Sequence, residues 1–262
     1  MSYLIDTHCH LHDRQFFEAE QAEEMVKNAF KNGVKKIVCI GTDPDDSLVA
    51  RDFAVSHVNM FWTYGIHPEE TNKDRKPLKL ASLEEIRKAF STSRPVAIGE
   101  VGLDYHDEAH DRDAQIKLFN EMLQLAKDND LPLSFHVRNA FDDFFAVVKN
   151  FPEVRGVVHS FTDSKKTLKK ILEETDFYVG VNGLATYSTL PTPPLEKILL
   201  ETDAPFLTPI PFRGIINEPA YIYNIAEWLT KKLEIDFETI KKVTTDNAEQ
   251  LFHLSDSGNS KA

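Results

Sequence analysis

Short apolar runs alternate along this chain with longer amphipathic stretches. Eight of the apolar runs have the length of strands, and they cover residues 3–7, 34–40, 60–66, 95–101, 131–137, 155–161, 177–181 and 197–202. Polar and apolar positions alternate little within them, which is typical of parallel strands that are buried on both faces. The pattern therefore predicts eight buried parallel strands.

Helical character is found between and after these runs, at residues 22–31, 45–56, 82–90, 112–129, 141–150, 164–174 and 219–232. Ser82 and Glu85 form a capping box at the start of one such stretch. The connection between the seventh and eighth strands, residues 182–196, differs because Pro191, Pro193 and Pro194 oppose a regular helix. We expect that helix to be short or absent, and residues 236–254 to add extra helical turns.

Eight strand–helix alternations are compatible with a closed barrel or with a doubly wound sheet. The length of 262 residues suits one (β/α)₈ barrel, which takes roughly 250 residues. Together these observations predict an α/β fold, a TIM barrel that forms a single domain over residues 1–254. Residues 255–262 are small and polar, and we expect them to form a disordered tail.

The composition, with 42% hydrophobic and 27% charged residues, is that of a soluble globular protein. The two cysteines, Cys9 and Cys39, make no disulfide framework, which favours a reducing cytosol. The first residues lack the features of a signal peptide, and no stretch approaches the ~20 apolar residues that span a bilayer. We expect a cytoplasmic protein without membrane contact, and no sequence feature indicates an obligate protein partner.

The formal net charge of the chain is −12. Proteins that wrap nucleic acid usually present a basic face, so this charge argues against a tight nucleic-acid binder. Metal ions can nevertheless supply local positive charge to an acidic protein that acts on phosphates. A nuclease that contacts only a few nucleotides therefore remains compatible with the composition.

Ionisable side chains occur where the predicted strands end. In "DTHCHL", Asp6, His8 and His10 occupy alternate positions and point the same way if the strand continues, whereas Cys9 faces away and packs. Five more ionisable residues follow or end other strands: His67, Glu100, His136, His159 and Asp203. The carboxyl ends of barrel strands converge on one mouth, so we expect these side chains to form one site.

Imidazole and carboxylate groups together suit divalent ions such as Zn²⁺, Mn²⁺ or Mg²⁺. Singly, the histidines also fit as hydrogen-bonded core residues, Glu100 as a partner of Arg138, and Asp203 as a turn cap. Burying so many ionisable groups together costs several kcal/mol each unless something pairs them, which favours metal binding. Two ions bridged by one carboxylate would use all six predicted ligands: His8, His10, Glu100, His136, His159 and Asp203.

Other polar residues near this mouth are candidates for substrate binding. Arg138 follows His136 by two residues and either grips an anionic group bidentately or forms a structural salt bridge. Asp104 and Tyr105 either orient a ligand or contact substrate. Arg213 belongs to a polar loop that either contacts phosphate or caps a helix. Three further histidines are expected on the surface: His12, His106 and His110.

Several of these motifs are similar to those of a known family. From about residue 4 to residue 254 the chain contains, in family order, "DTHCHL", "GIHP", "AIGEVGLDY", "LPLSFHVRNA", "GVVHSF", "LLETDAPFLTP", "RGIINEP" and "TTDNAEQLF". It resembles the TatD-like metal-dependent hydrolases, the TatD DNase group of the amidohydrolase-type barrels. The resemblance implies a (β/α)₈ fold and divalent-metal-dependent hydrolysis, and known members include DNases that degrade single strands from the 3′ end.

By motif position, the resemblance also implies two ions that share Glu100 as a bridging ligand. The first ion would have three further ligands: His8, His10 and Asp203. The second ion would have two: His136 and His159. The substrate phosphate would lie near two more residues: His67 and Arg138.

Three features depart from the family pattern. The helix before the Glu-Thr-Asp motif is cut short, and Ile215 and Ile216 stand where a basic pair is common. The loop "YHDEAHDRD" is also more acidic than usual. The last two changes remove positive charge where a nucleic-acid backbone would run, so they bear on the substrate rather than on the metal chemistry.

These observations predict a metal-dependent hydrolase of ester bonds with two divalent ions, most simply a DNase acting on DNA or a short oligonucleotide. Glu100 and Asp203 are the predicted catalytic residues, and Asp203 would take the proton of the attacking water. Three alternatives stay open. They are a barrel hydrolase of a small-molecule ester, lactone, amide or phosphoester, a metal-binding module without turnover, and a deacylase acting on transfer RNA.

Overall fold

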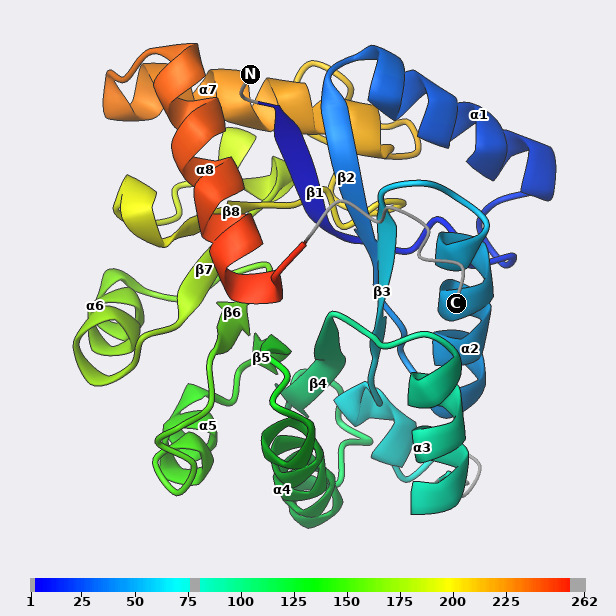
Figure 1. Ribbon diagram of the computed structural model, residues 1–262. Helices are drawn as coiled ribbons and strands as arrows, with labels where there is room; N and C mark the ends of the chain where they lie inside the picture. Colours follow the sequence, from blue (N-terminus) through cyan, green and yellow to red (C-terminus); the bar gives the residue numbers. More distant parts are fainter. Residues whose placement is uncertain (1–2, 76–80, 255–262) are drawn as a thin grey trace.

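Eight parallel strands form the centre of the computed structural model, which describes residues 3–75 and 81–254. Each strand pairs with the next in chain order, as Figure 1 shows. Their bounds are β1 Leu4–Cys9, β2 Val34–Cys39, β3 Met60–Tyr64, β4 Ala97–Asp104, β5 Leu133–Arg138, β6 Gly156–Val158, β7 Tyr178–Val181 and β8 Ile198–Leu200. All eight predicted strands are therefore present, with ends that shift by a few residues.

The segment after β8 returns to β1 and joins the two edges of the sheet. Cys9 and Ala204 form a parallel bridge. The Asp203 N–H donates to the His8 carbonyl (2.8 Å), and the His10 N–H donates to the Ala204 carbonyl (2.8 Å). The architecture is the predicted TIM barrel, and this closure brings Asp203 beside the two histidines of β1 and its extension.

Helices surround the strands, and their bounds are α1 Ala19–Lys31, α2 Pro44–Val55, α3 Leu83–Thr92, α4 Arg112–Asn129, α5 Phe141–Val148, α6 Lys165–Glu174, α7 Ile222–Leu233 and α8 Phe237–Phe252. Short 3₁₀ helices add η1 Pro68–Thr71, η2 Gly183–Thr186, η3 Leu195–Lys197 and η4 Pro219–Tyr221. The capping box of Ser82 and Glu85 starts α3 as predicted. Between β7 and β8 only η2 and η3 occur, so the shortened crossover is confirmed.

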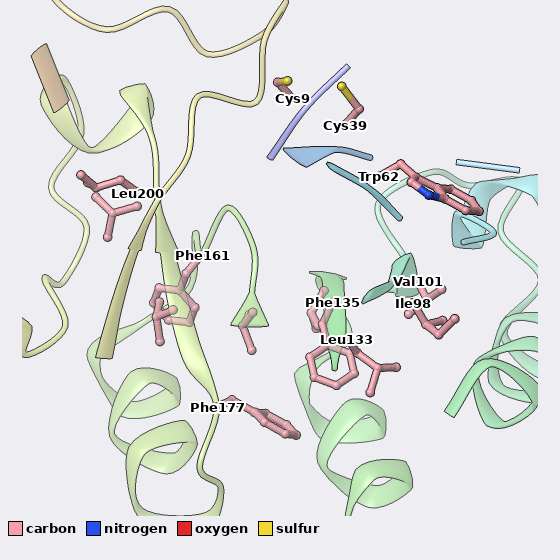
Figure 2. Packing of buried hydrophobic residues seen from close by; sticks show 14 of the residues in the cluster. Cys9, Cys39, Trp62, Ile98, Val101, Leu133, Phe135, Phe161, Phe177 and Leu200 are labelled. Atoms are coloured by element: carbon pink, nitrogen blue, oxygen red, sulfur yellow. The ribbon is translucent and has the colours of Figure 1, made fainter. Parts of the chain in front are cut away.

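The hydrophobic core has two layers, one outside and one inside the barrel. Outside, the Phe135 ring of β5 packs against Phe119 of α4, Phe144 of α5 and Phe177, with ring centroids 4.8–6.0 Å apart. Figure 2 shows Phe135 and Phe177 among the other apolar side chains of this cluster. The edge-to-face arrangement of Phe135 with Phe119 and Phe144 is the one that aromatic quadrupoles favour.

Inside the barrel, a smaller apolar cluster joins strand residues such as Ile5, Val157 and Leu199 to Leu251 and Phe252 of α8. Ile5 is the second residue of β1, and the Asn247 side chain of α8 donates to the Ile198 carbonyl at the start of β8 (2.9 Å), so α8 crosses the amino end of the barrel (Figure 1). The predicted extra helical turns are thus a full helix that covers the amino end. Polar groups at the carboxyl end of the barrel lie on the opposite side from α8.

One predicted boundary is wrong in a way that affects the site. Glu100 was expected to end the fourth strand, but β4 continues to Asp104. The register of β4 against β5 shifts between Ile98 and Val101, and the Glu100 N–H donates to the Gly41 carbonyl after β2 (2.7 Å). Such an irregularity re-aims one side chain within a strand. Glu100 therefore enters the barrel from the middle of β4.

Cys9 and Cys39 are buried free thiols at paired positions of β1 and β2, so the prediction that Cys9 packs is consistent with its place. No helix within residues 3–75 and 81–254 is long and apolar enough to cross a membrane. The disorder predicted for residues 255–262 concerns a segment outside the described residues.

We predict that Phe135→Ala lowers the free energy of unfolding by about 3–5 kcal/mol, because it leaves a cavity between the barrel and its helices. Phe135 is fully buried, whereas Val58 is 66% exposed and serves as the control. Val58→Ala should change the free energy of unfolding by about 0.5 kcal/mol or less. Urea denaturation of both variants measures the difference, and equal effects would contradict the assigned core.

Candidate metal centre

The Glu100 carboxylate lies at the centre of the polar cluster and has two sets of neighbours. Its Oε2 atom is 3.5 Å from His8 Nε2 and 4.0 Å from His10 Nε2. Its Oε1 atom is 2.8 Å from His136 Nδ1 and 3.0 Å from His159 Nε2. Each oxygen of one carboxylate thus faces a different pair of imidazoles.

Asp203 completes the first set. Its Oδ1 atom lies 3.6 Å from both His8 Nε2 and His10 Nε2, and these two nitrogens are 3.3 Å apart. Ligands around a tetrahedral ion with bonds of roughly 2.1 Å are about 3.4 Å apart. The spacing of these atoms is therefore compatible with three ligands around one metal ion.

The proton positions on His10 support the same interpretation. His10 Nδ1 lies 3.1 Å from the Ile40 carbonyl oxygen, which can only accept a hydrogen bond. In neutral His10 the hydrogen is therefore on Nδ1, and Nε2 presents a lone pair to the Glu100 and Asp203 carboxylates. Acceptors that converge on one point repel each other unless a cation lies between them. The residues present fit a divalent ion at this position.

The second set is held from outside by two more carboxylates. Asp104 Oδ2 lies 2.7 Å from His136 Nε2, and Glu201 Oε1 lies 3.4 Å from His159 Nδ1. A carboxylate on the outer nitrogen of an imidazole fixes its orientation and raises its basicity, as in many metal sites. Burial lowers the pKa of His136, but Asp104 and Glu100 outweigh burial and raise it to about 9. These carboxylates require positive charge between them, as a proton or as a metal ion.

The two acids that face the histidines are held in the ionised form. Burial raises the pKa of Glu100, but His159, His136 and His8 outweigh burial and hold the pKa well below its usual range. Burial likewise raises the pKa of Asp203, and its contact with His10 reverses this, so the net shift is downward. Both groups are therefore anionic at neutral pH and available to bind a cation.

His67 reaches the same cluster from the segment after β3. Its Nε2 atom is 3.8 Å from Glu100 Oε1, and its ring lies edge-on to His136 with centroids 4.4 Å apart. Burial lowers the pKa of His67, and the neighbouring His136 lowers it further, to about 3. His67, Glu100 and His136 form one of the groups that could hold an ion, so His67 lies close enough to be a ligand itself.

Glu201 is a site residue that the sequence reasoning missed. It is fully buried after β8, and its Oε1 accepts from the Ser160 N–H (2.6 Å). A Cβ atom on Gly180 would lie 2.4 Å from Glu201 Oε2, so only glycine leaves room for this carboxylate. A charged residue closing an apolar strand, in "LLETDAPF", was the available signal.

Two residues at the strand ends adopt left-handed backbone conformations. Asp203 has φ 58° and Ser160, which follows His159, has φ 45°. Such conformations are costly for residues other than glycine and persist where the surroundings impose them, often at functional sites. Here they direct a carboxylate and an imidazole toward the same point.

The remaining substrate-binding candidates lie farther out. The Tyr105 hydroxyl donates to Asp143 (2.8 Å), which also pairs with Arg112. The Arg213 guanidinium lies 3.9 Å from the centre of the Tyr187 ring. Arg138 is exposed at the end of β5, and Glu100 has histidine partners rather than Arg138.

His12 was predicted to lie on the surface, and this prediction is wrong. Its side chain is fully buried, with Nε2 3.1 Å from Asp46 Oδ1 at the start of α2. Burial lowers its pKa, but Asp46 outweighs burial and raises it to about 9. The side chain lies inside because α2 folds over the segment after β1. His106 is exposed as expected, and His110 is half-buried.

Comparison with known proteins identifies the family. The family described as TatD related DNase matches residues 5–253, nearly the whole chain. An uncharacterized metal-dependent hydrolase, YabD of Bacillus subtilis, is 33% identical over 96% of this chain and 100% of its own length. The chain therefore belongs to the TatD family of metal-dependent hydrolases, as its motifs predicted.

Other relatives bear on activity and on fold. The 3′-5′ ssDNA/RNA exonuclease TatD of Citrobacter rodentium is 29% identical, over 96% of this chain and 98% of its own. The crystal structure of YJJV, a TatD homologue of Escherichia coli, superposes with a TM-score of 0.82 at 28% identity, covering 95% of this chain and 98% of that one. A TatD family hydrolase of Entamoeba histolytica shares the fold, with a TM-score of 0.86 at 22% identity over 97% and 99% of the chains.

We predict that Glu201→Gln weakens the binding of Zn²⁺ or Mn²⁺ to the metal-free protein by about 10–100-fold, because His159 loses its charged outer partner. Calorimetric titration of the metal measures this without any substrate. Glu196→Gln, at an exposed position of η3 nearby in the chain, is the control and should bind metal as the native protein does. Equal affinities of the two variants would exclude this role for Glu201.

Proposed function

We propose that this protein is a two-metal phosphodiesterase that cleaves DNA, most simply by removing nucleotides from the 3′ end of a single strand. The proposal rests on the orientation of the Glu100 carboxylate. One of its oxygens faces His8 and His10, and the other faces His136 and His159. A carboxylate with this orientation can bridge two divalent ions, which would be Mg²⁺, Mn²⁺ or Zn²⁺.

In this proposal each side of Glu100 binds one ion. His8, His10 and Asp203 are the other ligands on the first side. His136 and His159, which lie 2.8 and 3.0 Å from Glu100 Oε1, are the ligands on the second side. His67 is close enough to join them or to contact the phosphate. When bound, such a pair of ions lowers the pKa of water and neutralises charge on a phosphoryl group.

The protein's own residues supply the proton transfers and the orientation. Asp203 is ionised, and its side chain is one of the few in the cluster with partial exposure (14%), so it can take a proton from an attacking water and return it to the leaving oxygen. The Glu201 and Asp104 carboxylates keep the His159 and His136 rings oriented while this occurs. Arg138, exposed at the end of β5, is placed to contact a non-bridging phosphate oxygen.

DNA as the substrate is supported by the family description and by the relative named as an exonuclease on single-stranded DNA and RNA. The net charge of −12 and the exposed Ile215 and Ile216 favour a second candidate, a hydrolase of small esters, lactones, amides or phosphoesters. The metal centre is compatible with both, so the choice depends on the substrate tested.

A substrate panel decides between these two functions. We expect cleavage of single-stranded DNA with Mg²⁺ or Mn²⁺, with mononucleotides released in order from the 3′ end, and slower cleavage of duplex DNA. The panel is assayed in the presence of each metal and contains labelled DNA, RNA, bis(4-nitrophenyl) phosphate, a lactone and an ester. Turnover of the lactone or ester without cleavage of any polynucleotide would replace the nuclease proposal with the second one.

We predict that Glu100→Gln lowers the rate of metal-dependent hydrolysis by about 100-fold or more, because both ions lose an anionic ligand. Losing a carboxylate that only supports a ligand costs about 10–100-fold, so losing a shared ligand should cost at least the upper value. Calorimetry should show weaker binding of both metal equivalents. The circular dichroism spectrum and unfolding transition serve as controls for the fold. Native activity with both ions bound would contradict the shared role of Glu100.

A further inference from the structure

Two exposed phenylalanines lie beside the metal centre. All eighteen phenylalanines fall within the described residues, and Phe16 and Phe206 are the two whose side chains are exposed, at 44% and 45%. Phenylalanine is usually buried, so an exposed pair in contact is a candidate binding surface. Their rings meet edge to face, with centroids 5.1 Å apart and planes at 80°.

The pair is continuous with the candidate metal ligands. The Phe206 ring lies 6.4 Å from the His10 ring, and Phe206 follows Asp203 by three residues. Its N–H donates to the Asp203 carbonyl (2.8 Å), and its own carbonyl accepts from the buried Asn217 side chain (2.6 Å). Phe206 is thus held by the same turn that aims Asp203 at the site.

Phe16 is also held in place although its ring is exposed. It lies in the segment between β1 and α1, where the N–H groups of Phe16 and Phe17 both donate to the Asp13 carbonyl (3.3 and 3.1 Å). Phe17 is 1% exposed and anchors this turn in the core. The backbone that carries the exposed ring is therefore held before any ligand arrives, which reduces the entropy lost on binding.

The chain as a whole supplies little attraction for a polyanion, because its net charge is −12. Arg14 is exposed close to Phe16 in the chain and keeps its charge beside the Phe53 ring, and Arg213 lies over the Tyr187 ring. The loop before α4 adds acidic residues, and the exposed Ile215 and Ile216 add no charge. Contacts to the bases would then add to the few phosphate contacts that these cations can make, and aromatic rings stack on any base because every base has a π-face.

We propose that Phe16 and Phe206 form a stacking platform for a nucleobase of the substrate, next to the bond that is cleaved. This inference rests on the proposed nuclease function and names the residues that would select a nucleobase-bearing strand. It also explains how an acidic chain binds a polyanion, through the metal ions at one phosphate and stacking at a neighbouring base.

The test compares Phe206→Ala and Phe16→Ala with Tyr223→Ala. Tyr223 is 43% exposed and contacts Phe237 of α8, so it is a matched exposed aromatic residue. Each protein, with metal bound, is assayed on a short single-stranded DNA and on the same strand with abasic sites at its 3′ end. Fluorescence anisotropy measures the equilibrium binding of both strands to the Asp203→Asn protein, in which the proposed catalytic acid is removed. The same measurement is made with the phenylalanine changes added.

We expect each phenylalanine variant to raise KM for the normal strand by about 5–100-fold, the loss that removing one base stack produces. KM for the abasic strand should be the same in the phenylalanine variants as in the native protein, and Tyr223→Ala should leave KM for both strands unchanged. Phe206→Trp should restore the binding that Phe206→Ala loses. The logarithm of affinity should fall with the logarithm of salt concentration with a slope no steeper than about −1.5, since each phosphate contact contributes about −0.7.

Equal losses on the normal and abasic strands, or no loss on either, would overturn the platform. A salt slope steeper than about −3 would also overturn it, because it indicates four or more phosphate contacts. If the native protein cleaves no polynucleotide, the anisotropy measurement still tests the stacking platform separately from the nuclease function. Base-dependent binding that is lost in Phe206→Ala would then support the platform and reject the nuclease, and absent binding would reject both.

Discussion

The burial of the Glu100 carboxylate among imidazoles is the interaction on which the rest of the site depends. The side chain is 6% exposed, and within 4.0 Å its Oε2 atom has two imidazole nitrogens and its Oε1 atom has three. A buried carboxylate is costly unless positive charge or hydrogen bonds compensate it. The histidines provide this compensation only because strands far apart in the sequence bring them to the same point. The polar cluster therefore depends on the barrel.

The two ends of the barrel have different roles. At the amino end, Leu251 and Phe252 of α8 pack on the apolar interior and contribute stability without any chemistry. At the carboxyl end, Glu201 is buried beside Gly180, and Asp203 adopts a left-handed backbone conformation. Such costly features are tolerable because the large core elsewhere stabilises the fold.

The net charge of the chain is consistent with the way the proposed substrate would bind. A chain with net charge −12 does not attract a long polyanion at a distance. Positive charge from bound metal would be confined to the cluster around Glu100, and the exposed rings of Phe16 and Phe206 lie beside it. Such a site would hold the end of a strand more readily than its length, which agrees with an exonuclease.

The sequence by itself determined the eight strands and the family, because apolar runs and motifs are read directly along the chain, and together with the length of 262 residues it predicted the barrel. It also identified the residues that cluster, since the carboxyl ends of barrel strands converge. The tertiary structure decided how they meet: a register shift turns Glu100 inward from the middle of β4, Glu201 supports His159, and α2 buries His12. These details depend on distances between strands and helices that only barrel closure sets, so no local pattern could encode them.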